Sequence, residues 1–180
     1  WVPPPPDPKD LPVGEAGYSL QLGIQRLQDA LDSITRDSDR YTLIVDLGGK
    51  ATTFFSYRDV NMAQAYRPAD AEPEALRKML LGALRYGKPF AIDMLSLPLD
   101  EEALKDLLDP VLPGLLKLLL SKEIIKEENY AKLIRDTDGD EYQLKYWKEK
   151  NLEFFNFVVL TKTPQPPEWT HEKFFIIKTV

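Results

Sequence analysis

The chain has 180 residues, of which 43% are apolar and 29% are charged, and its formal net charge is −6. This composition excludes a chain that is disordered throughout, and the length suffices for one domain with a sizeable core. The acidic balance disfavours a nucleic-acid partner, because phosphate binding needs a basic face.

Cysteine is absent and His171 is the single histidine. The sequence therefore offers neither disulfides nor thiol-ligated zinc, predicts no metal site, and fits a reducing intracellular compartment. The longest apolar runs reach about half of the ~20 residues that a membrane span requires, and no signal-peptide pattern opens the chain, so we expect no membrane partner. Because the chain starts with Trp1 and stops on an apolar run, we expect it to be a fragment of a longer protein.

The first 39 residues divide into two predicted segments. Residues 1–17 are rich in proline, which neither pairs in a sheet nor propagates a helix, so they are predicted to be a linker; an SH3- or WW-type ligand is the alternative. Residues 18–39 carry apolar side chains at three- and four-residue spacing, which predicts an amphipathic helix capped by Ser19. We expect its apolar stripe to dock on the domain's own core, with a partner protein as the alternative.

Residues 40–180 are predicted to form one α/β domain. Apolar runs predict buried strands at 41–46, 90–95, 154–161 and 174–180. Periodic segments predict helices at 73–86, 100–109 and 111–121, the first ending at Gly87, while 67–73 is expected to be a surface loop and 53–57 a short helix or a strand. The alternation of strands and helices favours a parallel sheet, whose ligand would lie at the carboxyl ends of the strands.

Residues 130–147 alternate apolar and polar positions on both sides of an Asp-Gly turn, which predicts an inserted β-hairpin. A calcium loop is the sharper alternative, but an EF-hand loop needs glycine at position 6 and glutamate at position 12. Counted from Asp136, glycine comes too early and the last position is Trp147. The hairpin turn is the better interpretation.

The segment around Asp46 differs at two positions from a Walker A loop, G-x-x-x-x-G-K-[ST]. In that loop, backbone N–H groups and the lysine bind phosphates, and the hydroxyl holds Mg²⁺. Here the first glycine is replaced by Ile44 and the hydroxyl by Ala51, with Thr52 one place late. A nucleotide-binding site would use the following residues and the acid that ends the next predicted strand: Gly48, Gly49, Lys50, Thr52 and Asp93.

Catalysis would need more than these residues supply. A Walker B strand offers two acids, one for the metal and one to polarise water, and here Asp93 is followed by Met94. We therefore predict no catalytic residues. The plainer expectation is that Asp46 and Asp93 cap helices or bind loop amides, and that Lys50 is solvated or paired with Asp93.

Four motifs follow one another along the chain: Leu43-Ile-Val-Asp46-Leu-Gly-Gly49-Lys-Ala51, Leu76-Arg77-x-x-Leu80-x-x-Ala83-Leu84-x-x-Gly87-x-Pro89-Phe-Ala-Ile-Asp93, Leu108-Asp109-Pro110-Val111-Leu112 and Phe155-Asn-Phe157-Val-Val-Leu-Thr161-Lys162-Thr-Pro164-Gln-Pro166-Pro-Glu-Trp169. Together they resemble the fifth AAA module of dynein heavy chains, in the P-loop NTPase superfamily, over about residues 40–178. The stretch looks most like the C-terminal domain of IQ-motif and ankyrin-repeat proteins. It departs from the dynein pattern in having Leu47 for proline and Lys50 for glutamine.

The resemblance implies a P-loop NTPase-like, AAA-type parallel sheet flanked by helices, with the hairpin inserted and without a helical lid subdomain. It also implies a non-catalytic module of a larger scaffold that binds protein partners and no cofactor, in the cytoplasm or on the cytoskeleton and, through dynein, in cilia. The alternative is a weak nucleotide binder that holds ATP or ADP with Mg²⁺ on the Gly48-Gly49-Lys50 loop.

Overall fold

The computed structural model describes Trp1 and residues 18–180, so most of the predicted linker at 1–17 lies outside the described residues. Within them, a parallel sheet of six strands has the order β1-β6-β2-β5-β4-β3. The strands are β1 Leu20–Leu22, β2 Thr42–Val45, β3 Asn61–Gln64, β4 Pro89–Asp93, β5 Asn156–Thr161 and β6 Phe175–Thr179. The predicted parallel α/β fold is thus confirmed.

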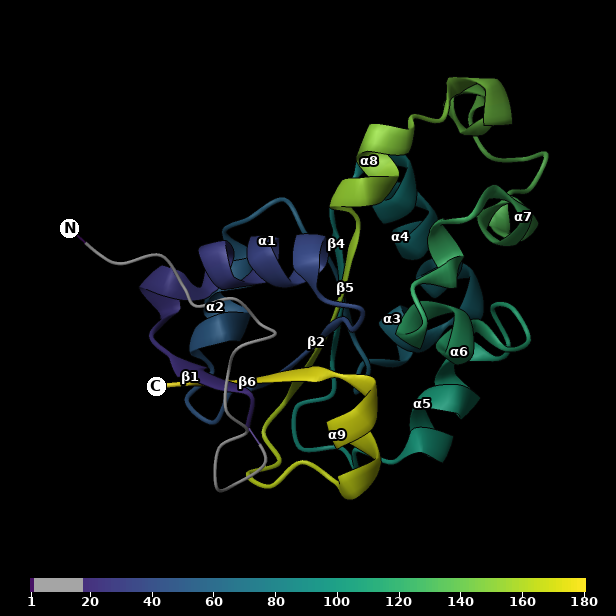
Figure 1. Ribbon diagram of the computed structural model, residues 1–180. Helices are drawn as coiled ribbons and strands as arrows, with labels where there is room; N and C mark the ends of the chain where they lie inside the picture. The colour runs from purple at the N-terminus through teal and green to yellow at the C-terminus, as the bar shows by residue number, and fades with distance from the viewer. Residues whose placement is uncertain (2–17) are drawn as a thin grey trace.

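Helices cover both faces of this sheet, and Figure 1 shows α1 and α2 on one side and α4 to α8 on the other. The α-helices are α1 Leu27–Asp37, α2 Lys50–Ser56, α3 Pro68–Ala71, α4 Pro73–Tyr86, α5 Glu101–Leu108, α6 Leu115–Leu120, α7 Glu127–Tyr130, α8 Glu149–Phe154 and α9 Glu168–Lys173. Short 3-10 helices are η2 Ile24–Arg26, η3 Glu123–Ile125, η4 Ala131–Leu133, η5 Asp140–Tyr142 and η6 Leu144–Tyr146. Across residues 18–180, no helix is long and apolar enough to cross a bilayer.

The central strands bury side chains on both faces, which explains why their sequences read as unbroken apolar runs. In β2, Leu43 and Val45 join the core under α4, α5 and α6, whereas Ile44 joins the core under α1 and α2. The same division holds along β5, where Val159 and Val158 point to opposite cores. Two apolar layers therefore hold the sheet from either side.

The predicted helix at 18–39 begins later than expected. Leu20–Leu22 forms β1 instead, pairing with β6 so that Leu20 lies opposite Ile177, and the helix α1 starts at Leu27. The Ser19 N–H donates to the Ile176 carbonyl at 2.8 Å, so pairing along the sheet edge outweighs the helical periodicity of these few residues. Docking of α1 on the domain's own core is confirmed, because its apolar stripe is buried under the sheet.

The predicted hairpin at 130–147 is wrong. After Tyr130, the last residue of α7, this segment contains the 3-10 helices η4, η5 and η6 and no strand. Its Asp-Gly stretch folds around the buried guanidinium of Arg77, which donates to both carboxylate oxygens of Asp138 at 2.8 and 2.9 Å. Trp147 stacks on Tyr130 with ring centroids 4.3 Å apart. Tyr130 and Leu133 are buried in the core and Trp147 packs against it, whereas Leu144 and Tyr146 are exposed.

Some of the remaining predicted helices and strands agree with the structure, and others differ from it. The helix at 73–86 and the later buried strands are confirmed, with β5 starting at Asn156. Residues 53–57 belong mainly to the helix α2, and the predicted loop at 67–73 contains the short helix α3. The edge strand β3 escaped prediction because Asn61–Gln64 shows no apolar alternation, and only its pairing with β4 makes it a strand.

A pair of glycine substitutions tests how α4 is joined to the rest of the domain. Gly87 ends α4 with φ +69°, and a Cβ added there would lie 2.6 Å from the Asn151 carbonyl oxygen. Gly114 has φ +79° with nothing within 4 Å of an added Cβ. We expect Gly114→Ala to cost about 1 kcal/mol from the left-handed backbone alone. Gly87→Ala should cost roughly twice that because the close contact adds to the strain.

Urea unfolding of both variants measures this difference in the free energy of unfolding. Equal losses in the two variants would contradict the close approach of Gly87 to Asn151.

Candidate functional site

The candidate site lies where β2 and β5 end side by side at the carboxyl edge of the sheet. Val45 pairs with Thr161 in this part of the register. The helix α2, which follows β2, packs on one face of the sheet, while α9, which follows β5, packs on the other. Neighbouring parallel strands whose connections leave to opposite faces form a topological switch point, the usual ligand position in open α/β sheets.

Asp46 occupies this position directly after β2 and is only 2% exposed. Its Oδ1 accepts hydrogen bonds from the Ala51 N–H at 2.9 Å and the Thr179 hydroxyl at 2.8 Å, and its Oδ2 accepts one from the Thr52 N–H at 3.1 Å. These N–H groups belong to the first turn of α2, where unpaired donors and the helix dipole favour an anion. The predicted capping role of Asp46 is confirmed.

The glycines and the lysine of the loop face solvent or are held by hydrogen bonds to backbone carbonyls. The Gly49 N–H donates to the Asp46 carbonyl at 3.2 Å, and Gly49 has φ +71°, the left-handed conformation that favours glycine. Gly48 is exposed. Lys50 is also exposed, and its Nζ donates to the Val180 carbonyl at 3.2 Å. Of the two expectations for Lys50, solvent exposure is correct and pairing with Asp93 is not.

Asp93 ends β4, on the far side of β5 from Asp46, and is 2% exposed. Its Oδ1 accepts a hydrogen bond from the Leu95 N–H at 3.0 Å, as expected of an acid that binds loop amides, while its Oδ2 is buried without a partner. Burial raises the pKa of the Asp93 carboxyl above its ordinary value, and the charge of Asp46 adds to the rise, whereas the Leu95 N–H and Lys162 oppose it.

The turn after Asp93 is connected to the end of β5 by a backbone hydrogen bond. Leu95 has φ +51°, which is unusual for a leucine, and its carbonyl accepts a hydrogen bond from the Lys162 N–H at 2.8 Å. This bond ties the end of β4 to the end of β5. Asp93 is thereby fixed beside the strand that carries Thr161 and Lys162.

Lys162 and Thr179 complete the site. The Lys162 ammonium lies beside the loop, 3.9 Å from the position that a Cβ on Gly49 would take. Sequence reasoning placed Lys162 at a strand end but missed Thr179, whose hydroxyl binds Asp46 across 133 residues. Only the pairing of β6 with β2 could have revealed Thr179, since Lys178 lies opposite Val45.

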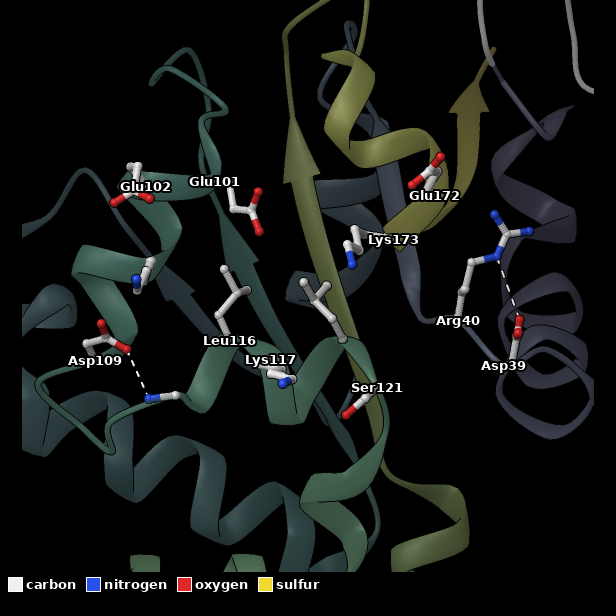
Figure 2. Close-up of a pocket in the computed structure, with 13 residues that line it drawn as sticks. Asp39, Arg40, Glu101, Glu102, Asp109, Leu116, Lys117, Ser121, Glu172 and Lys173 are labelled. Carbon is white, nitrogen blue, oxygen red and sulfur yellow. Dashed lines mark hydrogen bonds and ion pairs between the residues drawn. The ribbon is translucent and has the colours of Figure 1, made fainter.

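A separate cleft of about 670 Å³ lies between α5, α6 and α9 (Figure 2). Glu101 and Glu102 come from one wall, and Glu172 and Lys173 from another. The residues just before β2 and β6 also line it, so it lies towards the amino edge of those strands, away from Asp46. Acids and bases are mixed around it, which favours neither an anion nor a cation.

The Asp46 carboxylate holds the start of α2 in place. A phosphate at the start of α2 would have to displace the Asp46 carboxylate from the same N–H donors. Met94 stands where a second acid is needed. Among Trp1 and residues 18–180, no three acidic or histidine side chains are grouped so that they could hold a metal ion. No protein-family model matches the chain.

Proposed function

We propose that the chain is a non-catalytic, dynein-AAA-like module of a larger scaffold or interaction protein. The observation that carries this proposal is the buried Asp46 carboxylate, which takes the N–H donors of Ala51 and Thr52. A negative charge fixed there repels phosphate and occupies two of the N–H donors that a phosphate at the helix start would use. The module would bind protein partners inside the cell, in the cytoplasm or on the cytoskeleton, and its resemblance to dynein adds the cilium.

The arrangement of the strand ends supports the AAA-type assignment. Three adjacent strands, β2, β5 and β4, carry Asp46, the Thr161-Lys162 pair and Asp93 at their carboxyl ends. These are the positions of Walker A, Walker B and the sensor strand in the P-loop pattern that the motifs resemble. In support of a structural role, Asp46 binds the amides of Ala51 and Thr52, and Asp93 Oδ1 binds the amide of Leu95.

Isothermal titration of the protein with Mg-ATP and with Mg-ADP tests the proposal. We expect no binding heat from either nucleotide, because Asp46 already occupies the N–H groups of Ala51 and Thr52 and places a negative charge at the start of α2. Binding tighter than about 100 µM, which corresponds to about −5.5 kcal/mol, would contradict it. Such binding would also call for an ATPase assay on the same sample.

A second candidate function, weak nucleotide binding, rests on the unpartnered Oδ2 of Asp93. Carboxylate oxygens are ligands of Mg²⁺, and the exposed Lys50 follows β2, which is separated from the strand of Asp93 by β5 alone. This candidate predicts that Lys50→Ala abolishes any nucleotide heat and leaves the melting temperature nearly unchanged. Heat that survives Lys50→Ala would place the nucleotide elsewhere.

A further inference from the structure

Three lysines lie at the carboxyl edge of the sheet, at the ends of the neighbouring strands β6, β2 and β5. Lys162 follows β5 directly, and Lys50 begins the helix α2 after β2. Lys178 belongs to β6 and lies opposite Val45 of β2. We call these three residues the lysine group. Positive side chains thus occur together at one edge of a chain whose formal net charge is −6.

Contacts between the loops at this edge place the lysine group in one region of the surface. The Lys162 ammonium lies 3.9 Å from the position that a Cβ on Gly49 would take, in the loop before α2. The Lys178 ammonium lies 5.4 Å from the centre of the Tyr18 ring. The Tyr18 hydroxyl donates to the Pro164 carbonyl, two residues after Lys162. The loops after β2 and β5 and the end of β6 therefore adjoin one another.

The lysine group is open to a partner, whereas the two acids at the neighbouring strand ends are buried. Lys50 is exposed, Lys162 and Lys178 are half-buried, and none of them forms an ion pair with an acidic side chain of the described residues. Asp46 and Asp93 are each 2% exposed, and Asp46 is bonded to loop amides. A partner at this edge therefore contacts the lysines and not these carboxylates.

The spacing of the strands indicates the shape of that partner. Neighbouring strands lie about 4.8 Å apart, so β6 and β5, on either side of β2, are separated by about 10 Å. A single phosphate group does not span this width, whereas acidic side chains two residues apart in an extended segment are about 7 Å apart. We propose, building on the non-catalytic function proposed above, that the lysine group binds an extended acidic segment of a partner protein. Such a segment complements positive charge that is spread along the sheet edge.

Fluorescence anisotropy of a fluorescein-labelled hexaglutamate peptide, titrated with the protein at about 20 mM salt, tests this proposal. We expect saturable binding with a Kd on the order of 0.1 mM. A labelled hexaglutamine peptide, which has the same length without the charge, should not bind. Raising the salt to about 150 mM should weaken the binding of hexaglutamate at least threefold, because salt screens exposed charges.

A variant in which all three members of the lysine group are replaced tests the site itself. Lys50→Gln, Lys162→Gln and Lys178→Gln together should weaken the binding of hexaglutamate about tenfold, because three ion pairs at the surface are lost. Lys50→Gln alone should weaken it about twofold. This single change affects only an exposed side chain, so it reports on the site even if the triple variant fails to fold.

The matched control removes the same charge from exposed lysines of other segments, with Lys117→Gln in α6, Lys132→Gln in η4 and Lys148→Gln before α8. It should change the affinity less than twofold. Equal weakening by the two triple variants would show attraction to charge in general and would overturn the proposal.

The absence of saturable hexaglutamate binding also overturns the proposal. If Mg-ATP and Mg-ADP give no heat in the calorimetric titration of the same sample, only the acidic partner is refuted and the non-catalytic function stands. Heat from a nucleotide overturns that function instead, so the two failures are distinguishable.

Discussion

Replacing Arg77 with alanine is expected to lower the free energy of unfolding by about 3–5 kcal/mol, the cost of removing one partner from a buried ion pair. The Arg77 side chain is 2% exposed and that of Asp138 is 7% exposed. The guanidinium also donates to the Leu133 carbonyl at 2.8 Å and to Glu74 at 2.6 and 2.9 Å. Alanine would leave a buried carboxylate without its countercharge and release the segment after α7.

Arg85→Ala is the matched control, because Arg85 lies on the same helix, is half-buried and donates to the Glu141 carbonyl without facing a buried carboxylate. Its loss should stay within about 1 kcal/mol. Urea unfolding at pH 7 compares the two variants. A loss below about 1 kcal/mol for Arg77→Ala would show that the pair with Asp138 contributes little, as exposed pairs do.

The same ion pair sets a dependence on pH. The hydrogen bond from Arg77 holds the pKa of the Asp138 carboxyl below its ordinary value. A depressed carboxyl pKa contributes stability that is present above the unfolded value of about 3.9 and is lost as the pH falls through the folded value. The wild type should therefore lose this contribution below about pH 4. In Arg77→Ala that part of the acid dependence should disappear.

Replacing Asp46 with alanine is expected to cost about 3 kcal/mol, because the Ala51 N–H, the Thr52 N–H and the Thr179 hydroxyl lose their acceptor together. Each of these donors is buried or partly buried, so water replaces the carboxylate poorly. The loss should appear in urea unfolding and in faster hydrogen exchange of the first α2 amides.

Asp59→Ala is the control for this change, since Asp59 is 87% exposed and pairs with Lys88 at the surface. Its expected cost is within about 1 kcal/mol. If Asp46→Ala unfolds no more easily than Asp59→Ala, the carboxylate does not hold the loop. The structural interpretation of the near-Walker segment would then fail.

The elements that were predicted well are those whose signals are local. The helix α4 lies between Pro73 and Gly87, and the apolar run of β5 is buried on both faces, so short-range patterns suffice for each. β1 and β3 could not be predicted, because edge strands this short exist only through pairing with β6 and β4. The hairpin prediction failed for a related reason. Asp138 accepts hydrogen bonds from Arg77, which lies 61 residues earlier in the sequence. No local sequence pattern indicates that this arginine is buried.

Some contacts of the candidate site also follow from local sequence, whereas others depend on how distant strands pair. Asp46 is a few residues from the amides that it caps, so its role follows from a strand, a short loop and a helix in succession. The contact with Thr179 depends on the register between β2 and β6, and the path of the Lys50 side chain depends on the end of β6. The unpartnered oxygen of Asp93 likewise follows from packing around β4, which residue spacing does not reveal.

The amide chemical shifts of Gly49 to Thr52 during a titration with Mg-ATP test the central claim most directly, because they report on this loop alone, whereas binding heat reports on the whole protein. The Asp46 carboxylate already holds the amides of Ala51 and Thr52, so we predict that these signals stay in place to millimolar nucleotide. Saturable shifts of these amides, reversed by Lys50→Ala, would show that nucleotide displaces the carboxylate and would contradict a purely structural loop.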